Sequence, residues 1–308
     1  MILCCGEALV DMLPRADGHG LAPILGGSVF NTARALGRLG VNSGFLSGIS
    51  TDPFGQELIG DLEQSHVNTA LVKRGDGLTT LAFVHLENGN ASYRFYDEKS
   101  AGRMIYPKDF PTIPTEVNAM FFGGISLCFD PAASTYRDIC LANADSKLTM
   151  IDPNLRPDFV ADKKAYLNRL NEMIAACDIV KVSKEDLDLL IPTSQSEIEK
   201  LKSIKFLGPS VVILTKGGQG ALALTPSGEI VTATAPKVDV TDTIGAGDTF
   251  NAGFLAMLEA SGLLDKSAIG GISAANVQKS LAYGVKIAAI VVTRSGANPP
   301  WQSEIASL

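Results

Sequence analysis

Two aspartates flank a glycine pair where a helix is predicted to begin, in the stretch VDVTDTIGAGDTFNAGF from Val238 to Phe254. Gly245 and Gly247 relax the backbone, and the apolar run that follows has helical spacing. The first amides of a helix lack internal partners and carry the positive end of its dipole, so Ile244 to Asp248 predict a phosphate site. Asp248 would repel a polyphosphate unless a hydroxyl or a cation lies between them. That arrangement is expected of a general base in phosphoryl transfer.

The spacing alone leaves a second interpretation open, in which Asp248 only caps a helix and the glycines only make a tight turn. The segment DTIGAGDTF, however, resembles the signature of the ribokinase-like carbohydrate kinases, also called the PfkB family. In that family the matching aspartate takes the proton from the sugar hydroxyl. The resemblance therefore implies that Asp248 is the base and that Gly245, Ala246 and Gly247 form the anion hole.

A second motif lies more than 200 residues earlier, in the segment GGSVFNTARALGRLG from Gly26 to Gly40. It predicts a helix from about Ser28 with Asn31 in the first turn, where an amide side chain can reach into a site. The motif resembles the first signature of the same family, which implies that Gly27 and Asn31 bind the sugar. Asp11 follows a buried strand and is a candidate acceptor for sugar hydroxyls; the alternative is a solvated turn residue.

The strand and helix pattern predicts one α/β domain with a parallel sheet. Two β-rich runs, Thr79–His85 and Ala91–Tyr96, flank the hairpin signal Glu87-Asn88-Gly89-Asn90, which does not belong in such a layer. The resemblance implies a ribokinase-like three-layer α/β/α domain over residues 1–308, with a small β-sheet lid formed by roughly 8–25 and 72–105. Arg94 is a candidate lid contact to substrate, with an ordinary exposed strand residue as the alternative.

Further segments resemble parts of the family that handle phosphate and nucleotide. Asp152-Pro153-Asn154-Leu155-Arg156 resembles a DxNxR segment, and a guanidinium such as that of Arg156 suits a phosphoryl group or the substrate. Lys216 to Ala221 follows a strand and resembles the family's nucleotide loop, although it fits neither the P-loop nor the dinucleotide fingerprint. The resemblance implies nucleotide-binding residues at the following positions: Thr215, Gly217, Gly220 and Asn276.

Magnesium is the expected counterion of ATP. Many relatives carry Asn-x-x-Glu where this chain reads Ser183-Lys184-Glu185-Asp186, so the acidic role falls to Asp186 or to Glu185. Asp242 is a further candidate metal contact. The resemblance also raises a potassium-type cation near the end of the chain, but Ile244 lies where some potassium-activated relatives have threonine.

Composition bounds the partners and the location. The net charge is −7 and no block of Lys and Arg occurs, which argues against nucleic acid or an anionic membrane as partner. No apolar run approaches the roughly 20 residues that cross a bilayer. The five cysteines are odd in number and lie in apolar surroundings, which favours a reducing cytoplasm. A monomer, or a homodimer through the lid, is expected.

The function we expect from this resemblance is ATP-dependent phosphorylation of a sugar hydroxyl. The segments GEALVDM, FGGISL and DPNLR resemble the bacterial fructokinase branch, so the hypothesis is D-fructose converted to fructose 6-phosphate. A 2-keto-3-deoxygluconate kinase is the close alternative, and a ribokinase or a nucleoside kinase is a more distant one. A protein of another class, a non-catalytic sugar-responsive binding protein on the same fold, has no use for a base at position 248.

Overall fold

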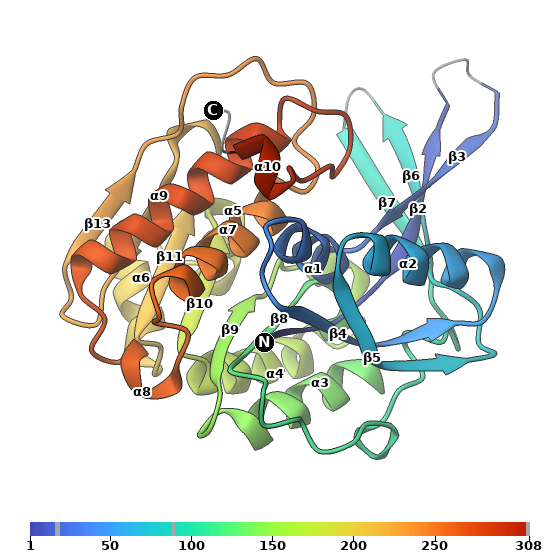
Figure 1. Ribbon diagram of the computed structural model, residues 1–308, viewed down its shortest axis with the longest axis horizontal. Coiled ribbons are helices and arrows are strands. Elements are labelled where there is room, and N and C mark those ends of the chain that lie inside the picture. Colours follow the sequence, from blue (N-terminus) through green and yellow to red (C-terminus); the bar gives the residue numbers. More distant parts are fainter. Residues whose placement is uncertain (16–18, 88–89, 306–308) are drawn as a thin grey trace.

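The computed structural model describes residues 1–15, 19–87 and 90–305 of the chain, so the predicted Asn88-Gly89 turn lies outside the described residues. Its centre is a nine-stranded sheet with the order β13-β12-β11-β10-β9-β8-β1-β4-β5 (Figure 1). All neighbours from β11 to β5 are parallel, whereas β12 and β13 join antiparallel. The strands are β1 (Ile2–Cys5), β4 (Ser43–Ser50), β5 (Val67–Gly75), β8 (Ala119–Gly123), β9 (Leu148–Asp152), β10 (Ile179–Ser183), β11 (Val211–Thr215), β12 (Ala221–Leu224) and β13 (Ile230–Ala233).

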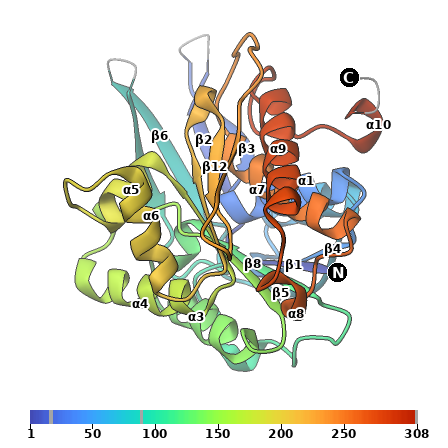
Figure 2. The ribbon, with the colours of Figure 1, turned by 90° about the vertical axis from the view of Figure 1, so that its left-hand side faces the viewer.

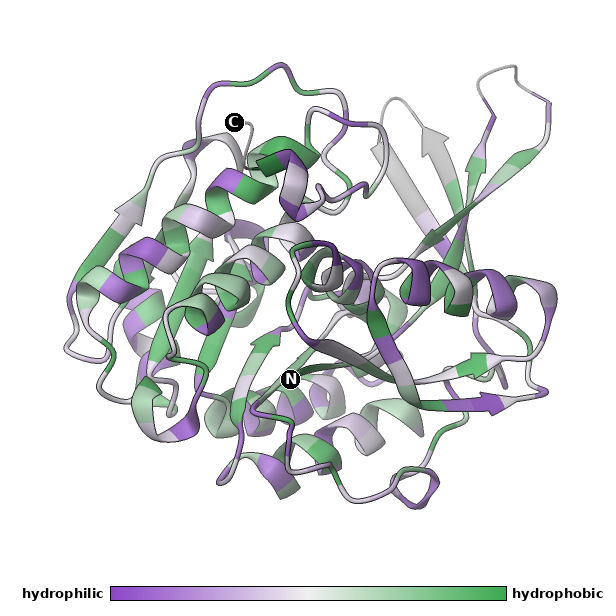
Figure 3. Cartoon of the chain, viewed as in Figure 1, coloured by the Kyte–Doolittle hydropathy of each residue, from purple (hydrophilic) through white to green (hydrophobic). Residues whose placement is uncertain are grey.

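Helices cover both faces of this sheet because its strands are apolar on both sides. Along β1, Ile2 and Cys4 belong to one core cluster and Leu3 and Cys5 to the other. The sheet thus lies between two helical layers (Figure 2), and apolar residues are concentrated on its strands (Figure 3). The first layer holds α1 (Ser28–Arg38), α2 (Pro53–Gln64), α7 (Ala246–Ala260), α8 (Lys266–Ile269) and α9 (Ala274–Val291). The second holds α3 (Ala132–Asn143), α4 (Lys163–Ala176), α5 (Lys184–Leu190) and α6 (Glu197–Phe206).

A second sheet of four strands stands out from these layers (Figure 1). Its order is β3-β2-β6-β7, with a parallel β2–β6 pair between two antiparallel pairs. The predicted lid is therefore present, but residues 72–75 of its expected second segment are the end of β5 in the central sheet. The lid strands are β2 (Leu9–Pro14), β3 (Leu21–Gly26), β6 (Leu81–Glu87) and β7 (Asn90–Tyr96).

Short elements complete the chain. They are the 3₁₀ turns η1 (Pro107–Asp109), η2 (Gly124–Leu127), η3 (Pro157–Phe159) and η4 (Gly217–Gln219), and the helix α10 (Gln302–Ile305). Asp52 caps α2, accepting a hydrogen bond from the Gly55 amide at 2.8 Å. Among the described residues, no helix is both long and apolar enough to cross a membrane.

Candidate active site

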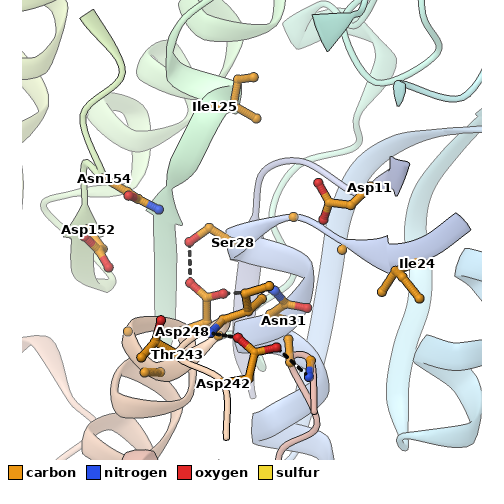
Figure 4. Close-up of a pocket in the computed structure, with 18 of the residues that line it drawn as sticks. Asp11, Ile24, Ser28, Asn31, Ile125, Asp152, Asn154, Asp242, Thr243 and Asp248 are labelled. Carbon is orange, nitrogen blue, oxygen red and sulfur yellow. Dashed lines mark hydrogen bonds between the residues drawn. The ribbon is translucent and has the colours of Figure 1, made fainter. Parts of the chain in front are cut away.

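A cleft of about 1290 Å³ opens between the lid and the carboxyl ends of the parallel strands. This edge is where parallel α/β sheets place their ligands, because the loops after the strands converge there. Figure 4 shows side chains from α1, α7, β2 and the end of β9 pointing into one space. The cleft brings together most of the predicted site residues.

The N-terminus of α7 forms the floor of this cleft. Gly245 precedes the helix with a φ of 77°, a left-handed conformation that favours glycine. Gly247 follows in the first turn, where a Cβ atom would lie 3.3 Å from Lys181 Nζ. Fewer amides are free here than the sequence predicted. The Ile244 N–H donates to Asp242 Oδ1, and the Ala246 N–H donates to the Thr243 carbonyl oxygen.

Asp248 lies in the first turn of α7 and is 9% exposed. The Ser28 hydroxyl donates to its Oδ1 at 2.6 Å, and the Asn31 Nδ2 group donates to its Oδ2 at 2.9 Å (Figure 4). Burial raises the pKa of Asp248 to about 6, and the charge of Asp152 acts in the same direction. The two hydrogen bonds and the charge of Lys181 act to lower this pKa. The carboxylate is thus held in place and is basic near neutral pH.

Three predicted sugar-binding residues surround this carboxylate. Asp11 on β2 points into the cleft (Figure 4), and burial together with the charge of Asp248 raises its pKa to about 6. Gly27 precedes α1 with a φ of 109°, and a Cβ atom there would lie 3.0 Å from the Glu7 carbonyl oxygen. Asn31 binds Asp248, and its Oδ1 is buried without a hydrogen-bond partner among the described residues.

The two predicted arginines differ in position. Arg156 lines the cleft, and its Nη1 donates to the Leu155 carbonyl oxygen at 2.8 Å. Arg94 is not among the lining residues, whereas its neighbours Tyr93 and Phe95 are. Side chains alternate along a strand, so Arg94 projects from the opposite face of β7. The expected contact of Arg94 with substrate is therefore not supported by its position.

Of the predicted nucleotide-binding residues, two line the cleft and two do not. Thr215 and Gly217 line the cleft. Gly220 does not; a Cβ atom there would clash with the Ala233 carbonyl oxygen, so this glycine allows close packing of β12 and β13. Asn276 lies in the first turn of α9, and it is the segment after the other end of that helix, Ser295 to Asn298, that lines the cleft. An 18-residue helix is about 27 Å long, which separates Asn276 from the site.

The carboxylates proposed as metal contacts differ in how many hydrogen bonds they already accept from the protein. Asp186 accepts from the Leu155 amide with Oδ1 and from the Ser183 amide and hydroxyl with Oδ2, so it completes the capping box of α5, whose N-cap is Ser183. Asp242 accepts from the Ile244 and Gly296 amides. Glu185 lines the cleft and is exposed. No group of three or more acidic, histidine or cysteine side chains within the described ranges could hold a metal ion by itself.

A buried ion pair that the sequence reasoning missed also lines the cleft. Lys181 Nζ is 2.8 Å from Asp152 Oδ2, and Asn251 Nδ2 donates to the same oxygen at 2.8 Å. Burial acts to lower the pKa of Lys181, but its interactions with Asp152 outweigh this effect and the pKa is raised. A lysine inside the apolar strand Ile179–Ser183 was the available signal.

Glu7 and Ser28 were also missed as site residues. Glu7 directly follows the first strand and Gly6, and it is buried against the start of α1. Its Oε1 accepts from the Ser28 amide at 2.8 Å, and its Oε2 accepts from the Ser126 amide at 3.2 Å. An acidic residue between two apolar runs, Ile2–Cys5 and Ala8–Val10, was the signal in the sequence.

Comparisons with known proteins agree with this geometry. A family model described as pfkB family carbohydrate kinase matches residues 1–304. A fructokinase of Rhizobium leguminosarum bv. trifolii is 44% identical over 269 residues, which cover 86% of this chain and 82% of that protein. The structure of a Xylella fastidiosa fructokinase with bound ATP matches with a TM-score of 0.91 at 26% identity, covering 99% of this chain and 97% of that chain. A Vibrio cholerae O395 fructokinase in fructose, ADP and calcium ion bound form matches with a TM-score of 0.87 at 26% identity, with the same coverage.

Proposed function

The chain belongs to the pfkB family of carbohydrate kinases, and we propose that it transfers the γ-phosphoryl group of ATP to D-fructose, giving fructose 6-phosphate and ADP. The observation that carries this proposal is the setting of Asp248, a buried carboxylate beside the glycine-rich start of α7 inside the cleft. A pKa raised to about 6 leaves it mostly ionised at neutral pH yet able to accept a proton. A protein that only binds sugar gains nothing from this arrangement.

In the reaction we propose, a hydroxyl oxygen of the sugar attacks the γ-phosphorus while Asp248 accepts the hydroxyl proton. The bond from the γ-phosphorus to the bridging oxygen of ADP breaks as the new P–O bond forms. The amides of Gly245 and Gly247 and the dipole of α7 stabilise the charge on the transferred group. Closure of the lid excludes water, which would otherwise be phosphorylated in place of the sugar.

Magnesium fits this cleft as a companion of ATP rather than as a resident of a protein cage. Glu185 is an exposed carboxylate on the cleft wall, and Asp152 Oδ1 is buried with no hydrogen-bond donor among the described residues. Mg²⁺ is commonly held by one or two carboxylates together with substrate phosphates. When bound, it would neutralise charge on the phosphates, with Glu185 and Asp152 as the protein groups available to it.

The lid supports a neutral sugar over a sugar acid. The described lid residues that line the cleft are apolar or aromatic except for Asp11, a carboxylate that would repel an acidic substrate. Arg103 is the other arginine near the lid; it donates to the Asp130 carbonyl oxygen and lies over the Phe129 ring, so it is not directed at a sugar acid. These contacts favour fructose over 2-keto-3-deoxygluconate.

An ADP-release assay with Mg-ATP tests the proposal, with fructose, 2-keto-3-deoxygluconate, ribose and adenosine compared side by side. We expect a strong preference for fructose in kcat/KM. A preference for the sugar acid would keep the kinase mechanism and overturn the substrate. No ADP release with any of the four, together with measurable fructose binding, would favour the binding-protein alternative. Because ATP is the proposed co-substrate, we also propose a cytoplasmic location, as a monomer or a homodimer through the lid.

A further inference from the structure

Asp248 is tied to a second buried carboxylate through one serine. The Ser28 hydroxyl donates to Asp248 Oδ1 at 2.6 Å, and the Ser28 amide donates to Glu7 Oε1 at 2.8 Å. The Val29 amide also donates to Glu7 Oε1, at 3.4 Å. Glu7 thus occupies the N-terminus of α1, where the helix dipole and the free amides favour an anion. Burial acts against these groups and raises the pKa of Glu7 to about 7, so Glu7 itself titrates in the neutral range.

This arrangement explains a buried glutamate that the reaction itself does not use. Glu7 is 9% exposed and also binds the Ser126 amide of η2, so it fixes the start of α1 relative to β1 and η2. Gly27 gives α1 no side-chain cap, and Glu7 takes over that task from another segment. The position of Ser28 therefore depends on Glu7.

The two oxygens of Asp248 have different partners. Oδ2 accepts from the Asn31 amide group, whereas Oδ1 accepts from a hydroxyl that lines the cleft. A carboxylate oxygen can accept two hydrogen bonds, so Oδ1 can hold the Ser28 hydroxyl and still accept from a sugar hydroxyl. A donor fixed on Oδ1 stabilises the ionised form, which is the form that can act as a base.

We propose that Glu7 and Ser28 are positioning residues of the phosphoryl transfer: Glu7 holds the first turn of α1, and through it the Ser28 hydroxyl holds Asp248 ionised and oriented toward the cleft. The inference rests on the proposed function, because it assigns these residues to the base of that reaction. Ser28 acts on Asp248 and Glu7 acts on Ser28.

Other charges also face Asp248, and Ser28→Ala leaves all of them in place. They are Asp11 on β2, Asp152 on β9 and Lys181 on β10. A change in the titration of Asp248 in Ser28→Ala therefore reports the lost hydroxyl. The pKa of Asp248 should rise, since the hydrogen bond from Ser28 acts to lower it.

The experiment compares pH profiles of kcat/KM for fructose in the wild type, Ser28→Ala and Ser28→Thr. We expect the acidic limb of Ser28→Ala to move up by about one pH unit, the effect of one charge-assisted hydrogen bond. At about pH 8, above both midpoints, its activity should return to within a few-fold of the wild type. Ser28→Thr keeps a hydroxyl and should keep the wild-type midpoint. Thr32→Val is the matched control, because the Thr32 hydroxyl contacts the main-chain oxygens of Ser28 and Asp248 and not the Asp248 carboxylate.

Glu7→Gln tests the second link of the proposal, the action of Glu7 on Ser28. Its amide group would place N–H donors against the Ser126 amide, so α1 should shift and the same acidic limb should move in the same direction. In the Glu7→Gln, Ser28→Ala double variant, kcat/KM for fructose should be no lower than in the worse single variant. The reason is that Glu7 acts only through Ser28. Effects that simply multiply would overturn the role of Glu7.

Two other outcomes overturn the role of Ser28. A uniform loss at every pH would show that the hydroxyl is only structural, and a raised fructose KM with an unchanged midpoint would show that it only binds sugar. A wild type that releases no ADP with any sugar would instead refute the proposed function, which separates the two failures.

Discussion

At the residue scale, the buried carboxylate of Asp248 lowers the stability of the folded protein but is basic enough to accept a proton. Asp248 is buried near Asp152 and Asp11, and its raised pKa means that ionising it in the folded protein is unfavourable. Asn31 and Ser28 offset part of this cost by donating to its two oxygens. The side chain proposed to act as the base is therefore also one whose ionisation lowers the stability of the folded protein.

Asp248→Asn should separate activity from stability. Turnover should fall by about 10²–10⁴-fold, the usual contribution of a general base, while fructose binding persists. The folded protein should gain about 1 to 3 kcal/mol at neutral pH, because an amide avoids ionisation of a buried group whose pKa is raised. Asn31 can accommodate the change by turning its amide, since its Oδ1 has no partner within the described part of the chain.

Steady-state kinetics, calorimetric fructose titration and thermal unfolding would measure these three effects. Unchanged turnover would remove Asp248 from the reaction. Loss of fructose binding together with turnover would point to a collapsed site.

The pH dependence of kcat/KM follows from two carboxylates. The pKa values of Asp248 and Asp11 are both raised to about 6, and both residues work as anions, one as base and one as acceptor for sugar hydroxyls. Activity should therefore approach its maximum above about pH 7 and fall as the pH drops through 6, with a slope between one and two on a logarithmic plot. Asp11→Asn should reduce that slope to one and raise the fructose KM. A profile that is flat through pH 6 would contradict both assignments.

At the element scale the site depends on where helices begin. The starts of α1 and α7 face each other across the Ser28 to Asp248 hydrogen bond, although the two residues are 220 positions apart in the chain. Glycine precedes both helices, Gly27 and Gly245, each with positive φ. The amides at these starts remain available to Glu7 in one case and to the cleft in the other.

Helix starts also separate the two candidate magnesium residues. Asp186 closes a capping box with Ser183 and binds the Leu155 amide, so Asp186→Ala should lower the free energy of unfolding by about 1 to 3 kcal/mol. Glu185→Gln should leave stability unchanged and raise the Mg²⁺ concentration needed for half-maximal activity several-fold. Chemical denaturation and magnesium titrations of ATP turnover would measure the two effects. A higher magnesium requirement in Asp186→Asn, with stability intact, would reverse the assignment.

Motif-bearing segments could be predicted from the sequence, and weakly patterned ones could not. The helix starts at Ser28 and near Asp248 follow from glycine and cap chemistry that is local. Strand β5 (Val67–Gly75) was missed because its sequence, VNTALVKRG, does not alternate between apolar and polar residues. Helix α6 was missed although Ser196 and Glu199 form a capping box at its start.

Contacts between distant segments lay beyond sequence reasoning. Nothing local indicates that Glu7 would cap α1, or that Lys181 would pair with Asp152, because each contact depends on the register of the folded sheet. Asn276 was misplaced for the same reason. It lies in the first turn of α9, and the segment that follows the opposite end of this helix lines the cleft.

At the scale of the whole molecule, the lid and the central domain meet across the cleft. Phe95 on lid strand β7 lies edge-on to Phe159 of η3, with ring centroids 4.9 Å apart. Residue Arg156, directly before η3, lines the cleft. This aromatic pair thus joins the lid sheet to the segment that carries the cleft arginine.

Weakening the Phe95–Phe159 contact should increase the hydrolysis of ATP without transfer to sugar, while the enzyme stays active. Phe159→Ala removes the ring on which Phe95 rests, a pair interaction of about 0.5–1.5 kcal/mol beyond the area buried, so the closed lid should be less populated. Water then reaches the phosphoryl group more often, because exclusion of water depends on closure. We expect a several-fold rise in ADP formed per fructose 6-phosphate, together with a higher fructose KM, measured by assaying both products in parallel. Phe206→Ala is the matched control, since that ring is 92% exposed. An unchanged product ratio in Phe159→Ala would mean that closure does not depend on the aromatic pair, and that the β2 and β3 side of the lid excludes water by itself.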